Sequence, residues 1–313
     1  MTDWPRRLPL VFAVLAALTS CSREDRGTGK DTVLADASPP GGVARRVVRG
    51  APWDTAAGAV FAIPAEVPGM AWLIDPAYTD DQRLDTLQLD LRRDRGTELN
   101  LISGGDSLGM VQVGMAVPDS TGCNIWPVAV LDPVAPNTAR GEWRVAFQPG
   151  RVTGVAFDSL PGLSPADSAR LTVAVARAAS RLEDDTSAVF RGRPYVVRQA
   201  SRFRLTEDRR GVLAEVVRIV PQEANPLHEQ IVMILEELRE SPAVLTTAYH
   251  ERAIGLEEAT TSVELLAVLR VPAAGRHTVL LRRDQENGFT LQLVEQAGPG
   301  RWNQRWRSAF AGC

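Results

Sequence analysis

The sequence predicts a mainly β protein of the α+β class, with antiparallel sheets and meanders and one principal helix near residues 165–183. Two observations predict it. Short apolar segments with alternating side chains recur between turn residues, which is typical of antiparallel strands that bury one face. One segment instead repeats its apolar residues every three to four positions, as a helix does. The sheets are expected to form a sandwich-like body or part of a propeller-like one.

The composition is that of a globular protein, with 44% hydrophobic and 23% charged residues and a formal net charge of -3 over 313 residues. This charge balance argues against a nucleic-acid partner, because phosphate binding needs clustered Lys and Arg. Lys30 is the only lysine. It lies in a segment that we interpret below as a tether, so chemistry that needs a lysine in the folded body is excluded.

The amino terminus has the features of an export signal. Arg6 and Arg7 precede an apolar run at 8–18, which is too short to span a bilayer as a helix. The run ends in Leu18-Thr19-Ser20-Cys21, which resembles the lipobox of bacterial lipoproteins. The resemblance implies that residues 1–20 are a lipoprotein signal peptide and that Cys21 is the lipidation site. The alternatives are an ordinary cleaved signal with an incidental Cys and, from the arginine pair, twin-arginine export.

The next segment predicts how the body is attached. Residues 21–52 contain no aromatic side chain and are rich in Gly, Pro, Asp and Ser, so they are expected to be a flexible tether. Ser22 stands where the Asp that favours inner-membrane retention would be, so the resemblance implies an outer-membrane anchor that faces the periplasm. After the tether we expect a β unit at 53–160 and a helix plus a carboxy-terminal β meander at 161–313.

Strands are predicted on both sides of the helix. In the first unit they include the alternating Leu87, Leu89 and Leu91, and the segments 99–101, 110–115, 125–131, 143–147 and 152–157. In the second unit they are 195–205, 211–220, 243–254, 262–271, 278–283, 289–295 and 302–310. The segment 227–240 fits either a helix or a buried strand, and its branched apolar run favours the strand.

The helix and the last two turns have specific local signals. Ser164 and Pro165 suit the N-cap and first position of a helix, and Leu171, Val175, Ala178 and Leu182 share one face. Glu286-Asn287-Gly288 predicts a hairpin and Gly298-Pro299-Gly300 the next turn. This meander resembles a blade of the FG-GAP-type β-propellers, but it lacks their Asp-rich calcium loops, and no repeat supports a complete propeller.

The other two cysteines predict a disulfide. If Cys21 carries a lipid, Cys123 and Cys313 form an even pair in an exported, oxidising compartment. The alternative is two free, buried thiols. Neither cysteine belongs to a closely spaced ligand pair, so no metal site and no cofactor is predicted.

A ligand or partner surface is expected from aromatic and polar residues near the carboxy terminus. Strand alternation places Trp302, Trp306 and Phe310 on one face, where they could stack sugars or contact a partner; the alternative is packing in the core. Tyr249 and His250 lie in a polar cluster that is either part of such a site or the solvated face of a strand. No catalytic residue is assigned, because no nucleophile elbow or two-histidine metal motif is present.

These features predict a lipid-anchored cell-envelope protein whose body is a binding or structural interaction module at the periplasmic face. Its partners would be the membrane, through the anchor, and an envelope protein or glycan. The alternative is an envelope hydrolase, directed at glycans, with dispersed acidic catalytic residues. A deep pocket with converging carboxylates would favour the hydrolase, whereas a shallow surface with an apolar patch would favour the binding module.

Overall fold

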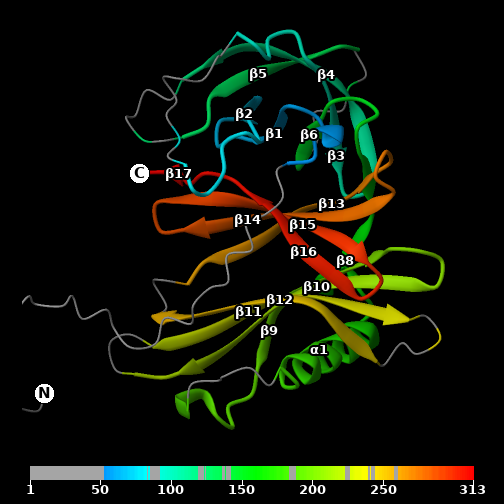
Figure 1. The fold of residues 1–313 in the computed structure, drawn as a ribbon, viewed down its shortest axis with the longest axis vertical. Helices are drawn as coiled ribbons and strands as arrows, with labels where there is room; N and C mark the ends of the chain where they lie inside the picture. The colour runs from blue at the N-terminus through cyan, green and yellow to red at the C-terminus, as the bar shows by residue number, and fades with distance from the viewer. Residues whose placement is uncertain are drawn as a thin grey trace, which may run out of the picture. The chain divides into compact units, whose positions relative to one another are not determined.

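The computed structural model of the protein describes residues 53–82, 84, 92–118, 123, 125–135, 138, 142–182, 188–222, 226–238, 240, 244–256 and 260–313. These residues form a closed barrel, two antiparallel sheets and one α-helix (Figure 1). The predicted class, mainly β with antiparallel sheets and one principal helix, is confirmed. The signal peptide, the tether and the strand predicted at Leu87, Leu89 and Leu91 lie outside the described residues.

The barrel contains six strands in the order β1-β2-β5-β4-β3-β6, and β6 pairs back to β1. Their bounds are β1 Phe61–Pro64, β2 Met70–Ile74, β3 Glu98–Ser103, β4 Asp106–Val117, β5 Val128–Pro133 and β6 Val145–Phe147, and the turn η1 Thr55–Ala57 precedes them. Strands β1 and β2 were not predicted. Nearly all of their residues are buried, so they lack the alternation of a half-exposed strand.

The first of the two sheets, here named the helix-side sheet, has the strand order β12-β11-β10-β9-β8. Its strands are β8 Phe157–Ser159, β9 Val196–Arg204, β10 Arg209–Val220, β11 Leu227–Leu238 and β12 Leu245–Leu256. The ambiguous segment 227–240 therefore contains a strand. Ten of the twelve residues of β11 are buried in an unbroken row, because the strand has a packed layer on each side.

The second sheet, here named the central sheet, has the order β16-β15-β14-β13-β7, and the short β17 also pairs with β15. Its strands are β7 Thr153–Val155, β13 Ser262–Val271, β14 Arg276–Gln285, β15 Gly288–Gly298, β16 Arg301–Arg307 and β17 Ala311–Gly312. Strand β7 pairs with β13, and β8 pairs with β9. Strands from both sides of residue 160 therefore share each sheet.

The layers are held together by separate apolar cores. Phe203 and Ile234 of the helix-side sheet pack against Val279 and Trp302 of the central sheet, which gives a β-sandwich. The other face of the central sheet packs against β1, β2 and β6 of the barrel, and the barrel has its own interior core. Helix α1 covers the remaining face of the helix-side sheet. The predicted sandwich-like body is therefore present.

Helix α1 spans Pro165–Ala179 and begins as its sequence predicts. The Ser164 hydroxyl accepts the Asp167 amide at 3.2 Å, and Leu171 and Val175 face the sheet. The helix ends four residues before the predicted end at 183, because Ser180 closes it: its hydroxyl donates to the Ala176 carbonyl at 2.9 Å. Two short 3-10 turns, η2 Leu160–Gly162 and η3 Ala188–Phe190, flank the helix in sequence. Within the described ranges, no helix combines the length and apolar character needed to cross a membrane.

The β14–β15 hairpin carries the carboxy-terminal strand. Gln285 pairs with Gly288, so the hairpin is present and its two loop residues are Glu286 and Asn287. The reason for Gly288 differs from the prediction, because it lies in the strand rather than in the turn. A Cβ at Gly288 would lie 2.2 Å from the carbonyl oxygen of Ala311, so glycine permits the close approach of β17.

Gly288→Ala is therefore expected to destabilise the protein by about 2 kcal/mol, because the backbone of β17 must move away. Gly298→Ala is the matched control, since nothing lies within 4 Å of a Cβ at Gly298. Urea unfolding of both variants measures the difference. Equal midpoints for the two variants would contradict the close packing of β17 on β15.

Candidate functional site

The predicted aromatic face on β16 is not formed, because the strand contains a bulge. Leu293 pairs with Trp306 and Val294 with Gln304, so Arg305 is an extra residue that reverses the alternation. Trp302 consequently packs between the two sheets, whereas Trp306 packs against the barrel. Each is only 2% exposed, and their indole N–H groups donate to Glu236 and to the Pro76 carbonyl, both at 2.9 Å. Core packing explains both tryptophans.

Tyr249 belongs to a polar cluster between β12, the edge strand of the helix-side sheet, and β14, β15 and β16 of the central sheet. Its hydroxyl donates to Glu251, which also forms ion pairs with Arg283 and Arg307 of the central sheet. Gln292 donates to the same carboxylate at 2.7 Å. Burial would raise the pKa of Glu251, but the two arginines and the hydrogen bonds hold it below its usual value. Burial and the Glu251 charge raise the pKa of Tyr249, so the phenol stays protonated and serves as a donor.

His250 does not join that cluster. It pairs with Met233 across β12 and β11, and alternation turns its side chain to the face that carries α1, opposite to Tyr249. The structure therefore separates these two predicted site residues, although they are neighbours in sequence.

A second polar cluster, centred on Glu229, was missed by sequence reasoning. Glu229 is 0% exposed, and it accepts from Arg218 and from the Tyr195 hydroxyl at 3.0 Å. The Arg252 Nε lies 3.5 Å from the other carboxylate oxygen, and Arg218 stacks on the Tyr195 ring at 4.5 Å. Burial and the Glu229 charge raise the pKa of Tyr195 to about 12. Its members are buried or half-buried and bond to one another, which is the arrangement of a structural network.

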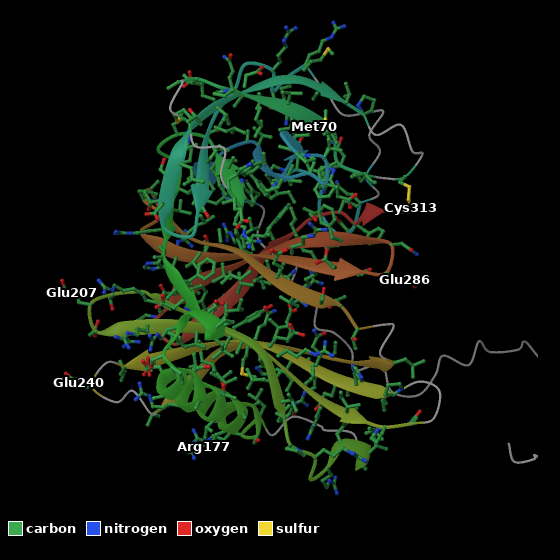
Figure 2. The ribbon with its side chains drawn as sticks, turned by 180° about the vertical axis from the view of Figure 1, so that it is seen from behind. Met70, Arg177, Glu207, Glu240, Glu286 and Cys313 are labelled. Carbon is green, nitrogen blue, oxygen red and sulfur yellow. A yellow bond between two sulfur atoms is a disulfide. The ribbon has the colours of Figure 1, made fainter. Side chains whose placement is uncertain are left out.

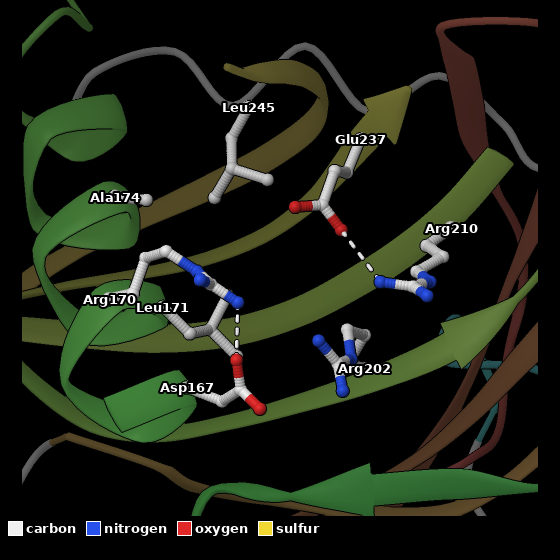
Figure 3. Close-up of a pocket in the computed structure, with 8 residues that line it drawn as sticks. All are labelled: Asp167, Arg170, Leu171, Ala174, Arg202, Arg210, Glu237 and Leu245. Atoms are coloured by element: carbon white, nitrogen blue, oxygen red, sulfur yellow. Dashed lines mark hydrogen bonds and ion pairs between the residues drawn. The ribbon is translucent and has the colours of Figure 1, made fainter. Parts of the chain in front are cut away.

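A hollow opens between α1 and the helix-facing side of the helix-side sheet (Figure 3). The space that it encloses is about 20 Å³, enough for about one water molecule. Its charged lining comprises Asp167, Arg170, Arg202, Arg210 and Glu237, with Leu171 and Leu245 as apolar walls. Asp167 and Arg170 form an ion pair within α1. The two carboxylates thus face three arginines rather than converging on each other.

The outer wall of the barrel exposes large apolar side chains. Met115 and Val117 of β4 are 69% and 40% exposed, and Val130 of β5 is 44% exposed. Val130 pairs with the half-buried Met70 of β2, which lies on the barrel in Figure 2. We name these four residues the barrel patch. A polar row that includes Gln112 and Asp132, paired across β4 and β5, borders it.

The two cysteines of the folded body lie next to each other. Cys123 and Cys313 are at disulfide-bonding distance, with their Cα atoms 4.7 Å apart. The bridge joins the loop before β5 to the end of β17, and the Cys313 amide donates to the Asn287 carbonyl at 2.9 Å. In the part of the chain that the structure describes, His, Cys, Asp and Glu form no group of three or more that could hold a metal ion.

Fold and sites together define a layered antiparallel β protein in which a small barrel packs on a β-sandwich. Comparison with protein family models, with curated proteins and with solved structures gave no match.

Proposed function

We propose that this protein is a lipid-anchored component of a bacterial cell envelope and that its body is a binding module for another envelope protein. The observation that carries the binding role is the barrel patch, where Met115, Val117 and Val130 are each at least 40% exposed. Exposed apolar side chains that lie together and are bordered by polar residues mark interaction surfaces. The hydrolase alternative needed converging carboxylates, and the hollow instead pairs its acids with arginines.

The cysteines support export and anchoring. Two of the three lie at bonding distance, which suits an oxidising compartment, and the third is Cys21 of the lipobox-like motif. The cysteine that remains outside the pair, Cys21, is the residue to which the resemblance to bacterial lipoproteins assigns the lipid. A lipid chain contributes about 0.8 kcal/mol per buried methylene, so two or more chains hold the protein at the membrane.

The anchor is tested on the full chain expressed in a bacterium with lipoprotein processing. We expect mass spectrometry to find a mature amino terminus at Cys21 that carries a diacylglyceryl group, and detergent to be needed to extract the protein. Ser22→Ala should leave both results unchanged, whereas Cys21→Ala should abolish the lipid mass. A mature chain that begins elsewhere, or an unmodified Cys21, would contradict the anchor.

The partner of the barrel patch is inferred to be a protein rather than the bilayer. The chain has a net charge of -3, and the row beside the patch carries the exposed Asp132, so anionic headgroups would be repelled. An apolar centre with a polar rim is instead the usual composition of a protein interface.

A photo-crosslinking residue at position 115 tests this surface in living cells. We expect a covalent adduct with a different polypeptide, and we expect the same polypeptide to co-purify with the wild type but not with Val130→Asp. The control places the crosslinker at Val173, which is 57% exposed on α1. Val130→Asp should melt like the wild type, because its side chain is partly exposed. Adducts with phospholipid or with a second copy of the chain, or no adduct at all, would contradict a protein partner.

A further inference from the structure

One lateral side of the β-sandwich is closed by the chain itself, and the opposite side ends in two terminal strands. On the closed side, only Ala156 separates β7 of the central sheet from β8 of the helix-side sheet, so the chain passes directly from one sheet to the other. The opposite side ends in β12 and β16. A terminal strand presents backbone N–H and C=O groups along its outer edge, where another strand can pair with them.

Strand β16 is protected on this side. Thr79 forms an antiparallel bridge with Ser308, and the Asp80 amide donates to the Arg307 carbonyl at 3.2 Å. The bulge at Arg305 also interrupts the edge of the strand. Natural sheets use short, bulged and partly covered edge strands of this kind to prevent the addition of a further strand.

Strand β12 has protective features only before residue 253. Its pairing with β11 shifts at Ala248, which forms a bulge. Glu251 points into the sandwich towards Arg283 and Arg307, and an inward-pointing charge also discourages strand addition. From Ala253 to Leu256 the strand has neither a bulge nor a charged residue. This end of the edge is therefore the part that can accept another strand.

The same end of β12 exposes apolar side chains. Ile254 is 43% exposed and Leu256 is 42% exposed. They pair with Glu229 and Leu227 of β11, on the face of the sheet that carries α1. The apolar core beneath α1 includes Ile231 but neither of these two residues, so α1 does not cover this corner of the sheet. A strand added beside β12 would pack its own side chains against both of them.

A second copy of the chain fits this edge poorly. In a two-fold pair of antiparallel strands, one residue lies opposite its own copy. If Ile254 and Leu256 are both paired, that residue must be Glu251 or a later one. Glu251 or Arg252 at this position would place like charges opposite each other, which is destabilising. With Ala253 or a later residue there, only residues 250–256 or fewer are paired. The charges of β12 therefore favour a strand of different sequence.

We propose that the outer edge of β12 from Ala253 to Leu256 takes up an extended segment of another protein as an additional strand of the helix-side sheet. The backbone of the segment pairs with that of β12, and apolar side chains at alternate positions contact Ile254 and Leu256. The segment has no proline where it pairs, because proline cannot donate to the ladder. The inference does not depend on the barrel patch, whose residues belong to β2, β4 and β5.

Two fluorescent hexapeptides test the edge on purified full-length protein. Thr and Val alternate in both, and in the second peptide every backbone nitrogen is methylated, so it keeps the side chains but cannot donate. We expect saturable binding of the first peptide by fluorescence anisotropy and binding of the second that is weaker by about tenfold or more. Hydrogen exchange of residues 253–256 should slow when the first peptide is bound, while exchange in β15 stays unchanged.

Variants locate the binding surface. Ile254→Ser should weaken binding of the first peptide by about fivefold, because a cross-strand apolar contact is lost. Ile219→Ser is the matched control, since Ile219 is 40% exposed but lies on β10, an interior strand of the same sheet. Both side chains are partly exposed, so both variants should melt close to the wild type, and their melting curves check this.

Several results would overturn the proposal. Equal binding of the two peptides would show that the apolar side chains attract the probe without strand addition. Absence of saturable binding at millimolar concentration, or slowed exchange away from β12, would exclude this edge as the site. A wild-type dimer in sedimentation velocity that Ile254→Ser dissociates would show that a second copy occupies the edge instead.

Discussion

Replacing Cys123 and Cys313 together by Ser is expected to lower the free energy of unfolding by about 5 kcal/mol. The two residues are 190 positions apart in sequence and their Cα atoms are 4.7 Å apart. A crosslink over such a long loop restricts the unfolded chain strongly, and the chain-entropy model gives the figure above as an upper value. Guanidinium unfolding monitored by tryptophan fluorescence measures it, because Trp306 and Trp126 are buried near this part of the fold.

Reduction provides the internal control for the disulfide. A reductant should destabilise the wild type to the level of the double variant and leave the variant itself unchanged. Wild-type protein with two free thiols in its native state, shown by mass spectrometry of non-reduced peptides, would refute the bridge.

Glu229→Gln is expected to lower the free energy of unfolding by about 3 kcal/mol, less than the loss of the disulfide. The substitution preserves the shape of the side chain but removes the charge that faces Arg218 and Arg252. Arg218 is 7% exposed and Glu229 is fully buried, so water cannot replace the lost carboxylate. Arg218 then faces a neutral amide in place of a carboxylate, and urea unfolding should show a lower midpoint with an unchanged slope.

Surface and double variants test the cause of that loss. Glu264→Gln breaks an ion pair with Arg144 in which both side chains are at least 40% exposed, so it should cost well under ~1 kcal/mol. Combining Glu229→Gln with Arg218→Met should recover part of the stability, because the charge that faces Glu229 is removed as well. Additive losses in the double variant would show that packing, rather than charge, is responsible.

Local sequence signals predicted those elements whose structure depends on neighbouring residues. Ser164 and Pro165 placed the start of α1, and the turns at 286–287 and 299–300 placed the last hairpins. The branched apolar run in 227–240 favours a strand, and the pairing of β11 with β10 and β12 confirms it. The predicted cysteine pair also lies at bonding distance.

The remaining features depend on contacts between residues far apart in the chain. Glu236 accepts from Trp302, 66 positions away, and Glu251 faces arginines of another sheet. No local pattern contains this information. The bulge at Arg305 likewise follows from pairing with β15, so simple alternation placed Trp302 and Trp306 on one face when they lie on two. One signal in the sequence does point to the buried polar clusters. It is the presence of acidic residues, such as Glu229 and Glu236, within the apolar run that forms β11.

The two-sided burial of the central sheet also limits how the sequence can change. Seven consecutive residues of β15, Phe289 to Glu295, are buried, so neither face of this strand offers a position for free substitution. Strand β4 differs, since Met115 and Val117 alternate with the buried Ala116. Substitutions can therefore accumulate at the exposed positions of the barrel wall at little cost to folding, while the central sheet stays nearly fixed.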